Sequence, residues 1–90
     1  MVRARIRLDT MASVADFVRQ LNSDGSVYKY TVEDFEGKHR VNARSYLGMI
    51  YASAEFGEHM YFVNETDDGM FPAFINEFRH PGDDGNFIHK

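Results

Sequence analysis

The 90-residue sequence contains no cysteine and only two prolines. Without cysteine there is no disulfide framework and no thiolate chemistry, which fits a reducing compartment such as the cytoplasm. Charged and apolar residues alternate over Val2 to Leu8, so the amino terminus lacks the unbroken apolar stretch of a signal peptide. The chain also lacks the run of roughly 20 apolar residues that a membrane span needs. We therefore expect a cytoplasmic protein without a membrane partner.

Positive charge is also scarce. Lysine and arginine number 10 against 14 aspartates and glutamates, which gives a net charge of −4. This balance argues against nucleic acid as the main partner. The four histidines, His39, His59, His80 and His89, lack the spacing that places two imidazoles on one helix face. The sequence therefore predicts no metal site and no cofactor.

The composition fits one small globular domain, because 43% of the residues are hydrophobic and 14% are aromatic. Turn-forming residues follow Phe78, where Pro81 and Gly82 stop the last apolar segment. We predict a domain over residues 1–80 and a carboxy-terminal tail over residues 81–90.

The first half of the chain alternates between strand and helix patterns. Val2 to Leu8 has the period of two of a strand buried on one face. From Ser13, the expected N-cap, apolar residues follow at helical spacing to Leu21. Val27 to Glu33 and His39 to Asn42 are then expected to pair as a hairpin.

The second half repeats the alternation. A helix is expected over Ala43 to Ala54, and its apolar face is predicted from Leu47, Ile50, Tyr51 and Ala54. Glu58 to Asn64 carries apolar residues on both faces, which is typical of a central strand. A last helix is expected after a cap at Thr66 or Asp67, with Pro72 in its first turn. The order βαββαβα predicts an α+β sandwich.

One stretch of this pattern resembles a known family. Val41-Asn42-Ala43-Arg44-Ser45, followed by Leu47-Gly48-Met49-Ile50, is similar to the start of the second helix in the histidine phosphocarrier protein (HPr) family of the sugar phosphotransferase system. The resemblance implies an open-faced β-sandwich: a four-stranded antiparallel sheet in the order 1-4-2-3 with three helices on one face.

The resemblance fails where the chemistry of that family resides. The family carries its phosphoryl group on a histidine at the start of the first helix, with an arginine two positions later. Alignment on Phe17 and Val18 places Thr10 at the histidine, and a shift by one residue places Asp9 there. A threonine phosphate ester is too stable to pass its phosphoryl group on. We therefore expect a divergent, non-catalytic member that lacks the active-site histidine.

Ser45 lies where many members of the family carry a regulatory phosphorylation site. A phosphate at a helix N-terminus meets free N–H groups and the positive end of the helix dipole. The alternative is that Ser45 is only an N-cap. The resemblance also implies partner contacts by Tyr46, Leu47 and Met49, with a serine kinase or a transcriptional regulator as the protein partner.

Two other features are open to two readings. Arg3, Arg5 and Arg7 form a row on the first strand, either as solvated charges beside acidic neighbours or as a partner surface. Six aromatic residues cannot all face the helices, which predicts an aromatic surface for a partner or a homodimer, or else isolated exposed rings: Tyr28, Tyr30, Phe35, Tyr51, Tyr61 and Phe62.

Three functions follow from these observations. The first is a regulatory, protein-binding relative of HPr that is switched at Ser45. The second is an interaction or structural module with the same fold and no link to sugar transport. The third is a phosphocarrier with an unusual acceptor.

Overall fold

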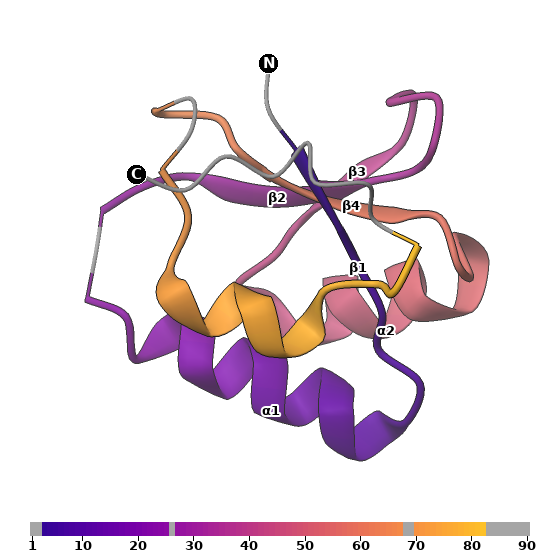
Figure 1. The fold of residues 1–90 in the computed structure, drawn as a ribbon, viewed down its shortest axis with the longest axis horizontal. Coiled ribbons are helices and arrows are strands. Elements are labelled where there is room, and N and C mark those ends of the chain that lie inside the picture. The colour runs from indigo at the N-terminus through magenta and orange to yellow at the C-terminus, as the bar shows by residue number, and fades with distance from the viewer. Residues whose placement is uncertain (1–2, 26, 68–69, 83–90) are drawn as a thin grey trace.

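The computed structural model describes residues 3–25, 27–67 and 70–82. Four strands and three helices follow one another in the predicted order (Figure 1). They are β1 (Arg3–Ile6), α1 (Met11–Asn22), β2 (Tyr30–Glu33), β3 (Arg40–Asn42), α2 (Tyr46–Glu55), β4 (Met60–Asn64) and the 3₁₀ helix η1 (Ala73–Phe78).

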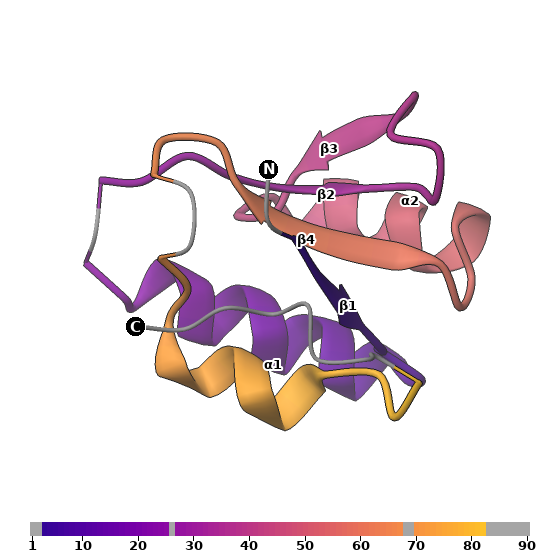
Figure 2. The ribbon, with the colours of Figure 1, turned by 45° about the horizontal axis from the view of Figure 1, so that its top comes forward.

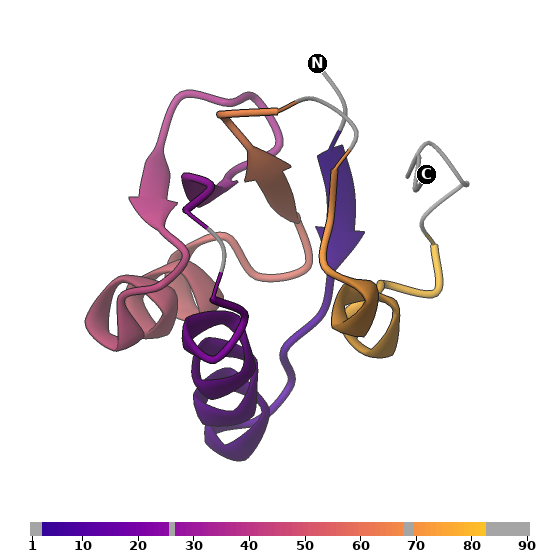
Figure 3. The same ribbon diagram turned by 90° about the vertical axis from the view of Figure 1, so that its left-hand side faces the viewer.

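The strands form one antiparallel sheet in the order β1-β4-β2-β3, and the three helices lie on one side of it (Figure 3). The α+β fold expected from the sequence, an open-faced sandwich with the order 1-4-2-3, is therefore confirmed. β4 lies between β1 and β2, as its two apolar faces predicted. α1 connects β1 to β2 and α2 connects β3 to β4, and each of these pairs runs in the same direction with an antiparallel strand between its members. Each of the two helices therefore returns the chain to the end of the sheet at which the preceding strand began.

The core lies between the sheet and the helices. Phe17 of α1 is at its centre, with its ring in edge-to-face contact with Phe62 of β4 and with Phe74 and Phe78 of η1. The centroid distances are 5.9 Å to Phe62 and 5.4 Å to Phe78, in the range that favours aromatic pairs. One side chain thus joins α1, the sheet and η1.

The first helix starts earlier than expected. Thr10, and not Ser13, is the N-cap. The Ser13 N–H donates to Thr10 Oγ1 at 3.0 Å, while the Thr10 N–H donates to Ser13 Oγ at 3.0 Å. This reciprocal capping box satisfies two otherwise unpaired donors, and it explains why a serine at the third helical position resembled a cap in the sequence.

The predicted apolar face of α2 is wrong. Leu47, Tyr51 and Ala54 are exposed, whereas Met49 and Ala52 are fully buried against the sheet. Of the four predicted residues only Ile50 packs against the core. Nearly all of this helix is apolar, so the spacing of its apolar residues did not single out one side.

The last helix differs from its prediction as well. Thr66 and Asp67 lie in a turn in which both backbone N–H groups donate to Asn64 Oδ1, at 2.9 and 3.0 Å. The helix begins after Pro72 and is a 3₁₀ helix of six residues. Pro72 is extended, with ψ at 143°, so it precedes the helix and does not lie in its first turn as predicted. Ile75 and Phe78 of the helix are buried in the core.

The chain continues from η1 along the free edge of β1 (Figure 2). The Arg7 N–H donates to Phe78 O at 2.7 Å and the His80 N–H donates to Arg5 O at 2.8 Å. This segment covers part of an edge that would otherwise be open to other strands. Residues 83–90 of the predicted tail lie outside the described residues. Within the described part of the chain, no helix is long and apolar enough to cross a membrane.

Candidate functional site

The connection between β3 and α2 carries the motif that resembles HPr, and hydrogen bonds fix its shape. Asn42 Oδ1 accepts from the Arg44 N–H at 2.9 Å, and Asn42 O accepts from the Ser45 N–H at 3.0 Å. Ala43 is fully buried and its N–H donates to Tyr30 O at 3.0 Å. The asparagine therefore forms the turn, and the alanine fits where a larger side chain would meet the core.

Ser45 is the N-cap of α2. Its Oγ accepts a hydrogen bond from the Gly48 N–H at 3.1 Å. A Cβ at position 48 would lie 3.3 Å from Asn42 O and 3.3 Å from Ser45 Cβ, so the glycine gives the cap its space. The first turn of α2 contains no acidic residue. The positive end of the helix dipole beside Ser45 is therefore not neutralised from within the helix.

Arg44 links this connection to α1 by hydrogen bonds. Its guanidinium donates to Leu21 O at 2.8 Å and to Tyr28 O at 3.3 Å, and it lies 5.1 Å from the centre of the Tyr30 ring. A cation at the C-terminal end of α1 adds a charged donor to a carbonyl that also accepts from the Asp24 N–H, and it complements the helix dipole. The motif residues thus have structural tasks that are independent of any partner.

The residues after Ser45 divide between surface and core. Leu47 is 78% exposed and Tyr46 is 43% exposed, as a partner surface requires. Met49 is 0% exposed, because it lies on the side of α2 that packs on the sheet. The assignment of Met49 as a partner-binding residue is therefore wrong, since a side chain in the core has no surface to offer. We call Ser45, Tyr46 and Leu47 the α2 surface.

The start of α1 holds the positions that align with the phosphate-carrying histidine. The Thr10 hydroxyl is the helix cap, and Asp9 Oδ2 pairs with Arg7 Nε at 3.1 Å. The sequence analysis did not expect this pairing, because the arginine of the family follows the acceptor, whereas Arg7 precedes Asp9 by two positions. Asp9 and Thr10 line a shallow depression of about 340 Å³ together with Arg7, Ser13, Glu77 and Arg79. Both alternative acceptor positions are exposed there.

Comparison with known proteins adds no relative. No family model, curated protein or solved structure matches this chain. The resemblance to HPr remains a prediction that rests on the motif, and the described fold is compatible with it.

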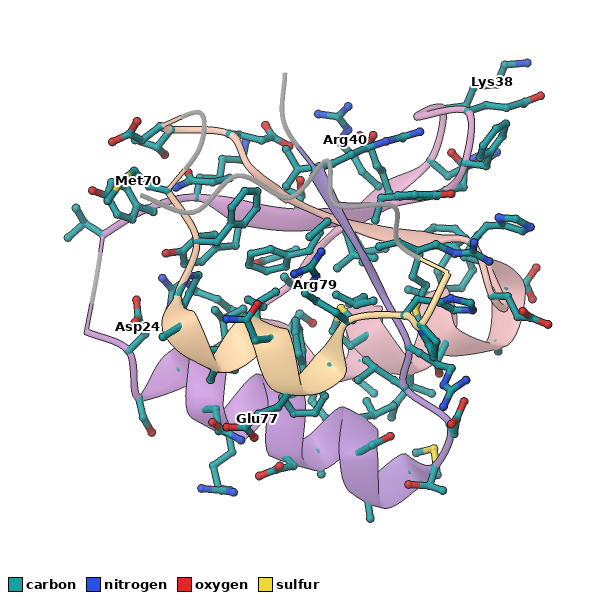
Figure 4. All side chains as sticks on the ribbon, viewed as in Figure 1. Asp24, Lys38, Arg40, Met70, Glu77 and Arg79 are labelled. Carbon is teal, nitrogen blue, oxygen red and sulfur yellow. The ribbon has the colours of Figure 1, made fainter. Side chains whose placement is uncertain are left out.

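The face of the sheet opposite the helices carries a network of ion pairs, which we call the open-face network. Glu33 of β2 binds Arg3 of β1 at 2.7 Å and Arg40 of β3 at 2.9 Å. Arg40 also binds Glu65 at 2.9 Å, and it lies on the side away from the helices (Figure 4). The predicted acidic neighbours of the arginine row are confirmed, because Arg3 pairs with Glu33, Arg5 with Glu58 and Arg7 with Asp9. The sequence did not identify Arg40 and Glu65 as members of the network.

Glu65 is held ionised within this network. The Thr31 hydroxyl donates to Glu65 Oε2 at 2.8 Å, and this hydrogen bond is the main reason why the pKa of Glu65 lies below its ordinary value. Partial desolvation opposes it, while Arg40 and Lys29 lower the pKa further. The network therefore consists of charges that balance one another on the face of the sheet.

The aromatic residues divide as the sequence predicted. Tyr30 and Phe62 are buried in the core, whereas Phe35 and Tyr51 are largely exposed. The exposed ones line a cleft of about 370 Å³, which we call the hairpin cleft; its lining residues are Asp34, Phe35, Glu36, His39, Tyr51, Glu55, Phe56 and His59.

The sequence did not predict the hairpin cleft, because its residues come from three distant segments: the β2–β3 turn, the end of α2 and the residue before β4. His39 and His59 thus lie at the cleft. His80 lies elsewhere, 3.4 Å from Glu58, and His89 is outside the described residues.

Proposed function

We propose that this protein is a non-catalytic, cytoplasmic protein-binding domain of the HPr type, which docks to a protein partner through the α2 surface and is switched by phosphorylation of Ser45. The observation that carries the proposal is the exposure of Leu47 and Tyr46 directly beside a half-buried serine N-cap.

The apolar character of the α2 surface supports docking. Met49 and Ala52 already supply the contact of α2 with the core, so Leu47 does not serve the fold in that way. Covering a leucine side chain with a partner contributes about 1.5–3 kcal/mol, and aromatic residues such as Tyr46 are enriched at interfaces. Two such side chains in one helical turn are suited to anchor a protein.

The position of Ser45 supports a switch. A phosphate on its Oγ would lie at the N-terminus of α2, where the first turn contributes no competing carboxylate. The modification would replace one hydroxyl acceptor by a dianionic group directly beside Tyr46 and Leu47. Phosphorylation is therefore expected to change partner binding without unfolding the domain.

Phosphorylation tests the switch directly. The protein is incubated with ATP and a serine kinase that phosphorylates HPr proteins, and the products are identified by mass spectrometry. We expect one phosphorylated species, which is lost in Ser45→Ala and retained in Ser53→Ala, a matched change in the same helix. Absence of incorporated phosphate, or equal loss in both variants, would contradict the regulatory role of Ser45.

Partner capture tests the docking surface. The immobilised protein is exposed to cytosol of its own organism, and the retained proteins are compared among wild type, Leu47→Ala and Ser45→Asp. We expect Leu47→Ala to weaken retention about tenfold to a hundredfold, from the leucine contribution given above. Val27→Ala, at an exposed apolar residue outside α2, is the control and should not change retention. If the only partner is a second copy of the chain, sedimentation will show a dimer that Leu47→Ala dissociates.

A phosphocarrier with a carboxylate acceptor is the second candidate, and the ion pair between Asp9 and Arg7 favours it. An arginine beside a carboxylate can neutralise charge on an incoming phosphoryl group. Incubation with phosphoenolpyruvate and enzyme I of the phosphotransferase system should then label the chain. A label that is lost in Asp9→Asn and retained in Thr10→Ser would replace the non-catalytic proposal.

A further inference from the structure

We infer that the hairpin cleft is a second docking site, which takes an arginine side chain of a partner protein. Aromatic side chains and three carboxylates line the cleft, and it does not include any residue of the α2 surface.

The aromatic side chains that line the cleft supply one part of the recognition of a guanidinium. Phe35 is 60% exposed and Tyr51 is 50% exposed, and both face the cleft together with Phe56 and His59. The ring centroids of Phe35 and His59 are 5.6 Å apart, and those of Tyr51 and Phe56 are 6.0 Å apart. A planar guanidinium stacks favourably on such ring faces.

The carboxylates supply the other half. Asp34, Glu36 and Glu55 line the cleft, and all of its other lining residues among those described are aromatic or histidine. Glu36 Oε1 forms an ion pair with Lys38 Nζ at 3.5 Å, and Lys38 lies at the exposed tip of the hairpin (Figure 4). Glu55 makes no ion pair within the described part of the chain. Glu55 therefore leaves negative charge in the cleft for a cation to balance, and Asp34 adds to it, although the charge of Asp34 also interacts with His39.

Asp34 is fixed in place and ionised. Its Oδ1 accepts from the Lys38 N–H at 2.9 Å and from the His39 N–H at 3.4 Å. Desolvation is the largest single effect and raises the pKa of Asp34, but the backbone hydrogen bonds and the charge interaction with His39 together outweigh it, so the pKa lies below the ordinary value. A carboxylate held by the turn needs no reorganisation to meet a guanidinium.

The protein itself contains the same type of contact beside the cleft. The Arg3 guanidinium lies 4.0 Å from the centre of the Tyr61 ring and 5.9 Å from the centre of the Phe35 ring. It also binds the Glu33 carboxylate at 2.7 Å. Phe35 therefore already takes part in a site of aromatic rings and a carboxylate that holds a guanidinium from within the chain.

A metal ion is a less suitable occupant. Among the described residues no three histidine, aspartate or glutamate side chains are grouped to hold a metal. The exposed aromatic rings supply no oxygen ligands for a hard metal ion, whereas they can stack directly on a guanidinium.

The test uses a short synthetic peptide, acetyl-Gly-Arg-Gly-amide, and an analogue in which neutral citrulline replaces arginine. Each is titrated into the ¹⁵N-labelled full chain, and binding is followed by NMR chemical shifts. We expect millimolar binding of the arginine peptide, with shifts at Phe35, Tyr51 and His59, and weaker binding of the citrulline peptide. Glu55→Gln should weaken the arginine peptide several-fold.

The control is Glu77→Gln, which removes the same charge from η1 on another side of the molecule (Figure 4). It should leave the affinity unchanged. Equal binding of the two peptides, equal loss in both variants, shifts outside the cleft, or no binding would each overturn the inference. Leu47→Ala should not alter peptide binding, so failure of the α2 surface and failure of the hairpin cleft are distinguished.

Discussion

Replacing Ser45 by alanine tests the capping interaction at the start of the candidate surface. The substitution removes the acceptor for the Gly48 N–H, which Ser45 Oγ now binds at 3.1 Å. Loss of such a cap costs about 1 kcal/mol, and unfolding a domain of this size requires on the order of 5–10 kcal/mol. A loss of that size lowers the melting temperature by roughly 4–8 °C.

Ser45→Asp keeps an oxygen acceptor at the N-cap of α2 but removes the hydroxyl group. Aspartate caps helices about as well as serine, and its charge also interacts favourably with the N-terminus of α2, where no acidic residue is present in the first turn. We therefore expect Ser45→Asp to have nearly wild-type stability at neutral pH. It can then serve in binding experiments without a folding defect.

Urea unfolding followed by far-UV circular dichroism measures these differences. The matched control is Ser53→Ala, because the Ser53 hydroxyl donates only to Ile50 O within α2, at 3.0 Å. Alanine favours the helix there, so this variant should be neutral or slightly stabilised. If Ser45→Ala unfolds at the wild-type urea concentration, or if Ser53→Ala loses as much stability, the capping explanation is refuted.

Three further predictions concern the fold and the open-face network. Phe17→Ala should lose about 3–5 kcal/mol in urea unfolding, because its ring joins three elements; a loss below that of Ser45→Ala would contradict its central place. Gly48→Ala should not give the gain of about 1 kcal/mol that alanine usually brings to a helix, since its Cβ would crowd a backbone oxygen at 3.3 Å; a full gain in urea unfolding would show that the crowding is relieved. The pKa of Glu65, measured by ¹³C NMR, should lie below 4.5 and rise in Thr31→Val. Because the folded pKa is the lower one, this group stabilises the fold above about pH 4.5, and the contribution is lost as the pH falls through the folded pKa; a Glu65 pKa unchanged by Thr31→Val would contradict the role of the hydroxyl.

Local patterns predicted the elements better than their orientation. The change from a period of two to helical spacing identified α1. The helix expected over Ala43 to Ala54 corresponds to α2, which begins at Tyr46 and is followed by Gly57 with a φ of 59°. For α2 the same reasoning chose the wrong side. An apolar helix has no preferred side until its cap and its neighbours fix its rotation, and here the turn at Asn42 places Met49 and Ala52 on the sheet.

The motif that resembles HPr illustrates the same division. The sequence offered Ser45 as an N-cap but expected the helix to begin at Ala43, whereas α2 begins at Tyr46 with Ser45 as its cap. The cap could be recognised because capping acts between residues three apart. The buried position of Met49 and the exposure of Leu47 depend on where the sheet lies. The hairpin cleft depends on still longer contacts, since the ring of Phe35 meets that of His59 across 24 positions of the chain.

The sequence by itself determined what short-range physics controls: the order of the strands and helices and the capping capacity of Ser45. Only the tertiary structure decided which side chains are on the surface, how Glu33 joins Arg3 to Arg40, and which residues form the hairpin cleft. The reason is that burial and ion pairing depend on distances between segments far apart in the chain, and the packing of the whole domain sets those distances.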